Sequence, residues 1–110
     1  IESGKSLDQS LGIENCKIRV IKLSDKKGSV IEVLRFHSHE QVLPDSNAAY
    51  APGIRHIALS VDSISETLTA IAEYVPQGPG TPSLSASQTV KMVYAWGPER
   101  TLFELVEIMK

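Results

Sequence analysis

Three side chains with metal-binding chemistry, Glu32, His56 and Glu104, stand among apolar residues in segments whose composition predicts β-strands. Each acid is the only charged residue of an apolar quintet, at positions 30–34 and 102–106, and alternation along a strand gives it apolar neighbours on its own face. An ionised carboxylate in such surroundings is costly unless a cation pairs with it. We therefore expect a metal or a basic partner at both acids.

His56 follows the same pattern on a predicted strand at residues 54–61, and imidazole is the commonest metal ligand among side chains that work buried and neutral. Two carboxylates and one imidazole, without a thiolate, suit a hard to borderline divalent ion such as Ni, Co, Zn, Mn or Fe. A hydrogen-bonded core histidine and paired structural acids are the plain alternative. The residues alone leave both interpretations open.

The elements that would position these residues are five strands and one helix. A capping-box pattern from Ser63 to Glu66 predicts a helix that runs to about Tyr74 with one apolar stripe. Residues 77–87 are rich in Gly, Pro and Ser and predict a loop. Alternating or β-branched composition predicts strands at residues 17–23, 29–36, 54–61, 90–96 and 101–108.

The two predicted hairpins form an internal repeat. Residues 17–36 align without a gap on residues 89–108 at a constant offset of 72, which places strand on strand, turn on turn and Glu32 on Glu104. A strand and a helix precede the second hairpin, whereas the matching region of the first would begin before Ile1. We therefore predict a single domain, 1–110, of two like modules, in which the first lacks its initial strand and helix. Its parts are a partial first module at 1–36, a linker at 37–52 and a second module at 53–110.

Composition bounds the class of protein and its partners. The chain has 110 residues, 42% of them hydrophobic, and a net charge of −2, as expected for one modest domain. The near-neutral charge argues against nucleic acid or a membrane surface as partner, and no apolar run is long enough for a membrane span or a signal peptide. We expect a cytoplasmic protein with a small-molecule substrate. Cys16, the single cysteine, is expected to be a buried thiol.

The segments around these residues resemble proteins of the vicinal oxygen chelate superfamily, which includes glyoxalase I, bleomycin-resistance proteins and extradiol dioxygenases. Residues 55–62, followed by 102–107, are similar to the second module of glyoxalase I-like proteins, and residues 30–34 to the end of the first. The resemblance covers roughly residues 10–108. It implies an α+β fold of paired βαβββ modules, with the first module lacking its initial strand and helix.

The resemblance also implies a metal site and a mechanism. In glyoxalase I, a His on the first strand and a Glu on the last strand of each module hold the metal, and His56, Glu104 and Glu32 match three of these four positions. The remaining His would fall in the missing strand, and family members commonly build the site across a homodimer interface. The implied mechanism is metal stabilisation of an enediolate, with Glu104 as the base that moves a proton between adjacent carbons.

Three functions remain open at this point. The first is a lactoylglutathione lyase-like enzyme, a lyase or isomerase acting on a small oxygen-rich substrate. The second is an Fe-dependent extradiol dioxygenase, which does not need an acid at Glu32, and the third is a metal-free binding protein of the bleomycin-resistance type. Tyr94 and Trp96 share a strand face near the proposed site and are candidate substrate-binding residues, with plain packing as the alternative. His37 and His39 match no ligand position of the family.

Overall fold

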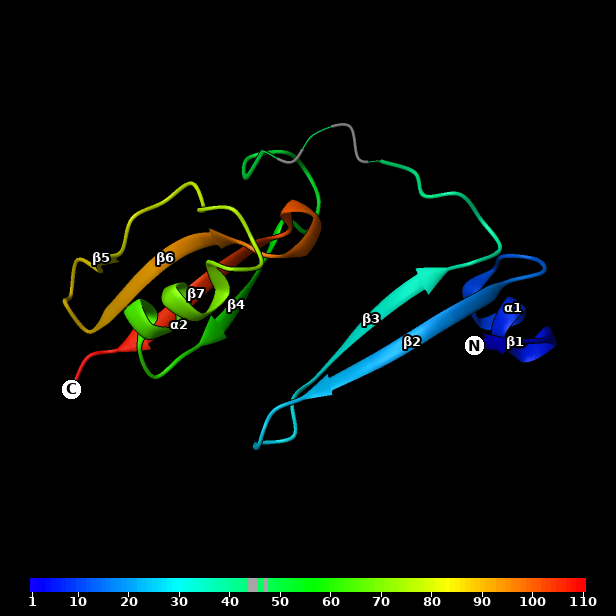
Figure 1. The fold of residues 1–110 in the computed structure, drawn as a ribbon, viewed down its shortest axis with the longest axis horizontal. Helices are drawn as coiled ribbons and strands as arrows, with labels where there is room; N and C mark the ends of the chain where they lie inside the picture. Colours follow the sequence, from blue (N-terminus) through cyan, green and yellow to red (C-terminus); the bar gives the residue numbers. More distant parts are fainter. Residues whose placement is uncertain (44–45, 47) are drawn as a thin grey trace. The chain divides into compact units, whose positions relative to one another are not determined.

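The computed structural model describes residues 1–43, 46 and 48–110, and its contacts divide the chain into two compact units, the first at residues 1–43 and the second at 44–110. The first unit contains β1 (Glu2–Ser3), α1 (Lys5–Leu11), β2 (Lys17–Ser24) and β3 (Val30–Phe36) (Figure 1). The second contains β4 (His56–Ser60), α2 (Ile64–Ile71), β5 (Ser83–Leu84), β6 (Val90–Trp96), a single 3₁₀ turn η1 (Pro98–Arg100) and β7 (Leu102–Ile108). Positions 44, 45 and 47 of the predicted linker lie outside the described residues.

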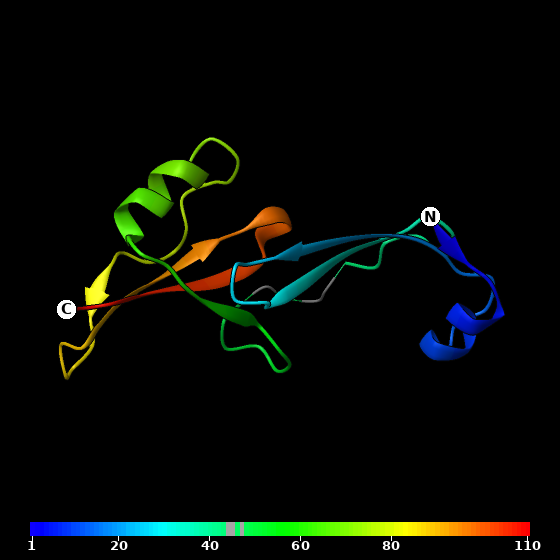
Figure 2. The same ribbon diagram turned by 90° about the horizontal axis from the view of Figure 1, so that it is seen from below.

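The second unit is one βαβββ module. Its strands lie in the order β4-β7-β6-β5, with β4 parallel to β7 and the other pairs antiparallel. Helix α2 covers one face of this sheet (Figure 2). The predicted strands are confirmed to within two residues at each end. Helix α2 ends three residues before the predicted Tyr74, and the short strand β5 lies inside the segment predicted as loop.

The core of the second unit lies between α2 and the sheet. Strand alternation turns every second residue of β6 and β7 toward the helix, whose Ile64 is the most deeply buried side chain of the cluster. No helix in the described part of the chain is long and apolar enough to cross a membrane. The core residues, each at most 4% exposed, are Ile64, Val93, Ala95 and Leu105.

Two side chains fix the start of α2. The predicted cap is confirmed, because the hydroxyl of Ser63 accepts a hydrogen bond from the amide of Glu66 at 3.2 Å. The carboxylate of Glu107 on β7 accepts a second bond, from the amide of Ile64, at 2.7 Å. The helix N-terminus is therefore tied to the sheet as well as to its own first turn.

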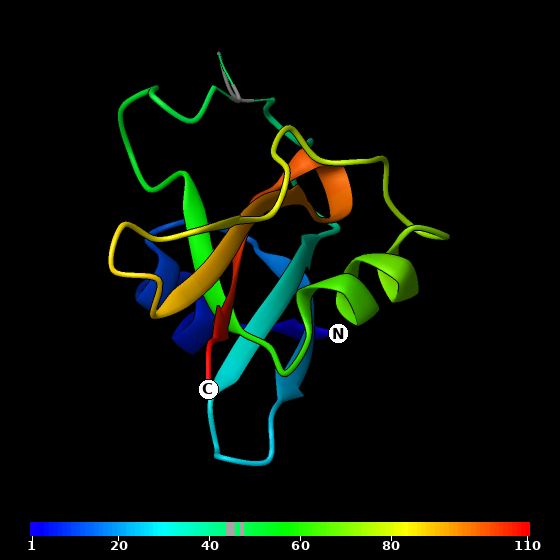
Figure 3. The same cartoon turned by 90° about the vertical axis from the view of Figure 1, so that its left-hand side faces the viewer.

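The first unit is built on the hairpin of β2 and β3 (Figure 3). The register of the hairpin runs from Ile18 opposite Phe36 to Ser24 opposite Val30. At its turn, the carboxylate of Asp25 accepts hydrogen bonds at 2.9 Å from the amides of Ser29 and Lys27. These bonds, that of Ser29 above all, lower the pKa of Asp25. Cys16 is buried and free, as predicted.

The pairing of β1 identifies what the first unit lacks. β1 pairs antiparallel with β2, as β5 pairs with β6, so it matches the second strand of the βαβββ module and not the first. In the described residues no strand lies beside the other edge of β3, where β4 pairs with β7 in the second unit. Helix α1 follows β1 and has no counterpart between β5 and β6. Among the described residues of the first unit, neither a strand equivalent to β4 nor a helix equivalent to α2 is present.

Matching positions of the repeat differ sharply in burial. Leu105 is 4% exposed and its equivalent Val33 is 50% exposed, while Val93 and Ile21 are 3% and 48% exposed. Helix α2 covers the first member of each pair, whereas α1 packs beside β1. Burial of this strand face therefore stabilises the second hairpin, and the matching face of the first hairpin contributes little.

Truncation of this matched pair tests the difference. Leu105→Ala should lower the free energy of unfolding by about 2–5 kcal/mol, because it leaves a cavity under α2. Val33→Ala should cost less than about 1 kcal/mol, the span of strand propensities on an open surface. Urea denaturation followed by circular dichroism measures both. Equal losses would show that the face carrying Val33 is covered in solution.

Candidate active site

His56, Glu104 and Tyr94 come together on the face of the second unit's sheet opposite α2, the site face. Glu104 on β7 stands opposite Ala58 on β4 and Tyr94 on β6, so these side chains point to the same side of the sheet. His56 is two residues before Ala58 on β4 and therefore points to that side as well. His56 Nε2 lies 3.3 Å from Glu104 Oε1. The rings of His56 and Tyr94 meet edge to face with centroids 5.1 Å apart. Strand register thus turns three residues distant in sequence into one cluster.

Tyr94 stands opposite Glu104 in the strand register, so the phenol and the carboxylate lie on the same face of the sheet. Partial burial, followed by the charge of Glu104 and hydrogen bonding to its carboxylate, raises the pKa of Tyr94 above its usual 10.0. All three causes favour the protonated phenol. Tyr94 is therefore a neutral hydrogen-bond donor across the physiological pH range.

The cluster is open to a reacting molecule. The side chain of His56 is 38% exposed and that of Glu104 is 19% exposed. A carboxylate held between an imidazole and a phenol, and still reachable from solvent, has the geometry of a general base. The chemistry that this arrangement can perform is proton transfer to or from a small bound molecule.

His56 and Glu104 also fit as two neighbouring ligands of one divalent ion, since a nitrogen and an oxygen donor lie 3.3 Å apart. The described residues contain no group of three or more His, Cys, Asp and Glu side chains that could hold a metal. Catalytic zinc sites use about three protein ligands. The second unit by itself therefore supplies a partial ligand set.

Glu32, the third predicted ligand, lies on β3 in the first unit. Its side chain is 51% exposed, and its Oε1 lies 3.7 Å from Nζ of Lys22 on β2. Glu32 is more exposed than its apolar neighbours in the sequence suggest, because no helix of the first unit covers the hairpin face on which it stands. Its basic partner is Lys22, in a pair too exposed to add much stability. A role for Glu32 at a metal stays a prediction.

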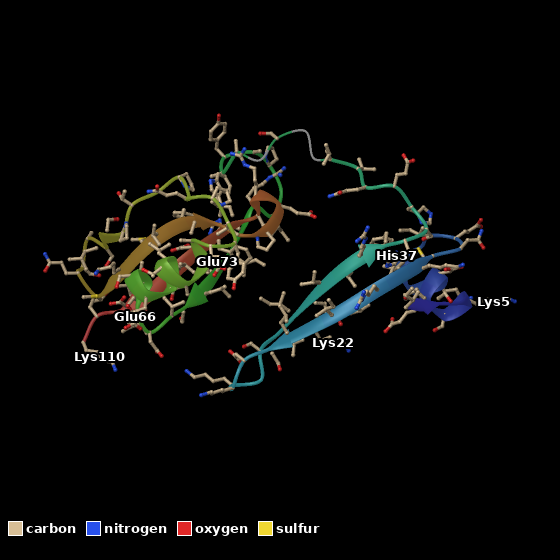
Figure 4. The ribbon with its side chains drawn as sticks, viewed as in Figure 1. Lys5, Lys22, His37, Glu66, Glu73 and Lys110 are labelled. Carbon is tan, nitrogen blue, oxygen red and sulfur yellow. The ribbon has the colours of Figure 1, made fainter. Side chains whose placement is uncertain are left out.

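The remaining candidates lie apart from this cluster or beside it. Trp96 lies two residues after Tyr94 on the site face of β6, half-buried, and its substrate-binding role stays a prediction. His37 directly follows β3 (Figure 4), and Nδ1 of His39 shares a hydrogen bond of 2.8 Å with Ser38. In the described residues neither histidine belongs to a potential metal cluster.

Comparison with known proteins supports this arrangement at the level of the fold. No protein-family model and no curated protein matches the chain. Among solved structures, it is similar to a glyoxalase family protein from Bacillus cereus, with a TM-score of 0.82 and 18% identity over 99% of this chain and 74% of that one. The chain has the glyoxalase fold.

A glyoxalase family protein from Enterococcus faecalis is also similar, with a TM-score of 0.49 and 21% identity over 92% of this chain and 82% of that one. The glyoxalase fold predicted from the sequence is confirmed by the Bacillus cereus structure. At 18% identity, the likeness establishes the fold, and the activity has to be argued from the residues of the site.

Sequence reasoning missed one residue that supports the site, Glu107. Its carboxylate holds the start of α2 on the core side of β7, three residues after Glu104. The available signal was an acid two residues after Leu105, which strand alternation places on the core face. The first amides of the predicted helix on that face need hydrogen-bond acceptors. Glu107 fixes the helix against the sheet that carries the site.

Ionisation of Tyr94 provides a direct test of the cluster. In a spectrophotometric titration, the difference between wild type and Tyr94→Phe should show a midpoint above pH 10. Because the folded-state pKa is raised, this interaction stabilises the fold fully below pH 10 and is lost as the pH rises through the raised pKa. Thermal unfolding across the same pH range should show that loss.

Glu104→Gln should move the Tyr94 midpoint downward, because the charge of Glu104 disappears while the partial burial remains. The titration is again read as a difference from the same variant with Tyr94→Phe added. Glu107→Gln removes an acid from the opposite face and should leave the midpoint in place. An equal shift in both variants would mean that Glu104 is not the partner of Tyr94.

Proposed function

We propose that this chain is a cytoplasmic, metal-dependent lyase or isomerase of the glyoxalase I type, which moves a proton between adjacent carbons of a small oxygen-rich substrate. The observation that carries the proposal is the position of Glu104. Its carboxylate lies 3.3 Å from His56 and opposite Tyr94 on the face of the sheet away from α2, and its side chain is 19% exposed. A base that removes a carbon-bound proton needs this combination of orientation and access.

Each member of the cluster has a role in this chemistry. Glu104 takes the proton from one carbon and returns it to the neighbouring one. His56 holds the carboxylate from the β4 side and Tyr94 from the β6 side, which limits the directions that the base can take. The neutral phenol of Tyr94 is also a donor that can follow negative charge as it develops on a substrate oxygen.

A divalent ion, Ni, Co, Zn, Mn or Fe, would be held by His56 and Glu104. Such an ion supplies electrostatic stabilisation of the enediolate charge. Because the second unit contributes two donors, the proposal includes a homodimer in which a second chain adds ligands.

One alternative has a specific observation in its favour. The two-donor set within the second unit also suits a metal-free binding protein of the bleomycin-resistance type. In that case the cluster would orient a ligand by hydrogen bonds without turnover. Metal content separates the two functions.

Elemental mass spectrometry of the purified, dialysed protein is the first measurement. We expect about one Ni, Co, Zn or Mn ion per chain in wild type and a large loss in His56→Ala, which removes the nitrogen donor. His37→Ala is the matched control, since it removes an imidazole that follows β3 in the first unit. Iron would favour the extradiol dioxygenase, and wild-type protein without metal would favour the binding protein.

Turnover tests the base. With the hemithioacetal of methylglyoxal and glutathione, and with other small hydroxycarbonyl compounds in deuterium oxide, Glu104→Gln should slow solvent exchange at carbon by about 10²–10⁴-fold without changing the circular dichroism spectrum. Glu73→Gln, on the segment after α2 (Figure 4), removes an acid away from the site and should behave as wild type. Exchange at the wild-type rate in Glu104→Gln would contradict the assignment.

A further inference from the structure

The turn between β6 and β7 holds two side chains in an unfavourable backbone conformation. Glu99 and Arg100 have φ of 55° and 59°, in the left-handed region that residues with a Cβ occupy at a cost. In the first repeat, the position that matches Arg100 is Gly28, with φ of 92°, and glycine adopts such angles freely. The second repeat keeps an arginine where a glycine would be relaxed. Strain of this kind points to a role for the side chain.

The side chain of Arg100 reaches the site face. Its Cζ lies 5.1 Å from the centroid of the Trp96 ring. Trp96 stands opposite Leu102, which stands opposite His56 on β4, so the indole belongs to the site face. Glu104 is two residues further along β7 than Leu102, roughly 7 Å away at the rise of a strand. A small molecule in contact with Glu104 is therefore within reach of the guanidinium.

Stacking on an indole leaves the donors of a guanidinium usable. The N–H groups lie in the guanidinium plane and form a fork that matches two oxygens of a carboxylate or a phosphate. Arg100 is exposed, and it is in neither of the ion pairs found among the described residues. The guanidinium of Arg100 is therefore exposed on the site face without an ion-pair partner among the described residues.

The other cations of the second unit are placed differently. Arg55 donates hydrogen bonds to backbone carbonyls of the preceding segment, those of Ser46, Ala51 and Pro52. Lys91 stands opposite Glu107 on the α2 side of the sheet. Lys110 follows β7 at the end of the strand away from the turn (Figure 4). In the described part of the second unit, Arg100 is therefore the cation available at the site face.

We propose that Arg100 binds an oxyanion group of the substrate, a carboxylate or a phosphate, and so selects anionic molecules for the site at Glu104. The inference rests on the proposed function of that site and adds its substrate class. Trp96 positions the guanidinium by a cation–π contact. The separation of roughly 7 Å between the rows of Trp96 and Glu104 suits a small acid whose reacting carbon lies a few bonds from the anionic group.

Trp96 provides the measurement, because it is the single tryptophan of the chain and its fluorescence reports on the stacked guanidinium. The protein as purified is titrated with 2-oxobutanoate, with the uncharged methyl ester of that acid and with inorganic phosphate. We expect the acid to bind roughly 10–100-fold more tightly than the ester, the range for a hydrogen bond to a charged group. Phosphate as a competitor distinguishes a carboxylate site from a phosphate site.

Variants separate recognition from a structural role. Arg100→Met keeps an apolar chain over Trp96 and should bind the acid as weakly as the ester. Arg100→Lys keeps the charge without the fork and should lose part of the preference. Arg100→Gly installs the residue of the first repeat and should be at least as stable as wild type while losing the preference. Lys91→Met removes the same charge from the opposite face and should keep the wild-type preference.

The outcomes are decisive in both directions. A preference for the acid that survives in Arg100→Met, or that is absent from wild type, would overturn the proposal. Failure of wild type to bind either 2-oxobutanoate or phosphate would also overturn it. Glu104→Gln should retain the anion preference, because binding at Arg100 involves no proton transfer. Loss of the proposed catalysis and loss of anion recognition are therefore distinguishable.

Discussion

The alternation of side chains along β7 is the constraint on which both the core and the site depend. β7 lies between β4 and β6, and its backbone hydrogen bonds to both fix one register. In this register Leu105 faces α2 in the core, and Glu104, its neighbour, faces the opposite side beside His56. A slip by one residue would exchange the two faces, burying the carboxylate and exposing the leucine. The hydrogen bonds that build the core therefore also place Glu104 beside His56.

The anchoring of α2 keeps the site face accessible. The side chain of Ile64 is buried in the core while its amide donates to Glu107, so the helix start is held to one face of the sheet by packing and by a charge-assisted hydrogen bond. Within the second unit, α2 therefore packs on the core face of the sheet. The other face retains the partial exposure of His56 and Glu104 that a reacting molecule requires.

Much of the second unit could be predicted from sequence because its signals are local and strong. The second hairpin and the Ser63 cap depend on short-range patterns in the sequence, and the structure confirms both. β1 and β5 have two residues each, too few to produce a period. The pairing of β4 with β7 joins segments distant in the chain, so the meeting of His56 and Glu104 followed from a family resemblance and not from periodicity.

Burial was harder to predict than secondary structure, because it depends on what covers a strand. The sequence around Glu32 and Glu104 is equally apolar, yet one carboxylate is 51% exposed beside Lys22 and the other 19% exposed beside His56. The difference comes from neighbouring elements: β4 and α2 flank the second hairpin, and the described part of the first unit has no equivalent of either. Five residues of sequence do not determine which other elements pack against them, so they do not determine burial.

The two hairpins share one backbone plan and differ in the residues at their turns. Both turns are closed by the same bond, from the amide of Asp25 to Ser29 O at 3.1 Å and from the amide of Gly97 to Thr101 O at 2.7 Å. The first turn is further relaxed by its carboxylate acceptor and by Gly28. In the second, a glycine replaces that acid and the left-handed position holds Arg100. The closing bond is retained, so the frame tolerates the strain at Arg100 while its side chain is directed to the site face.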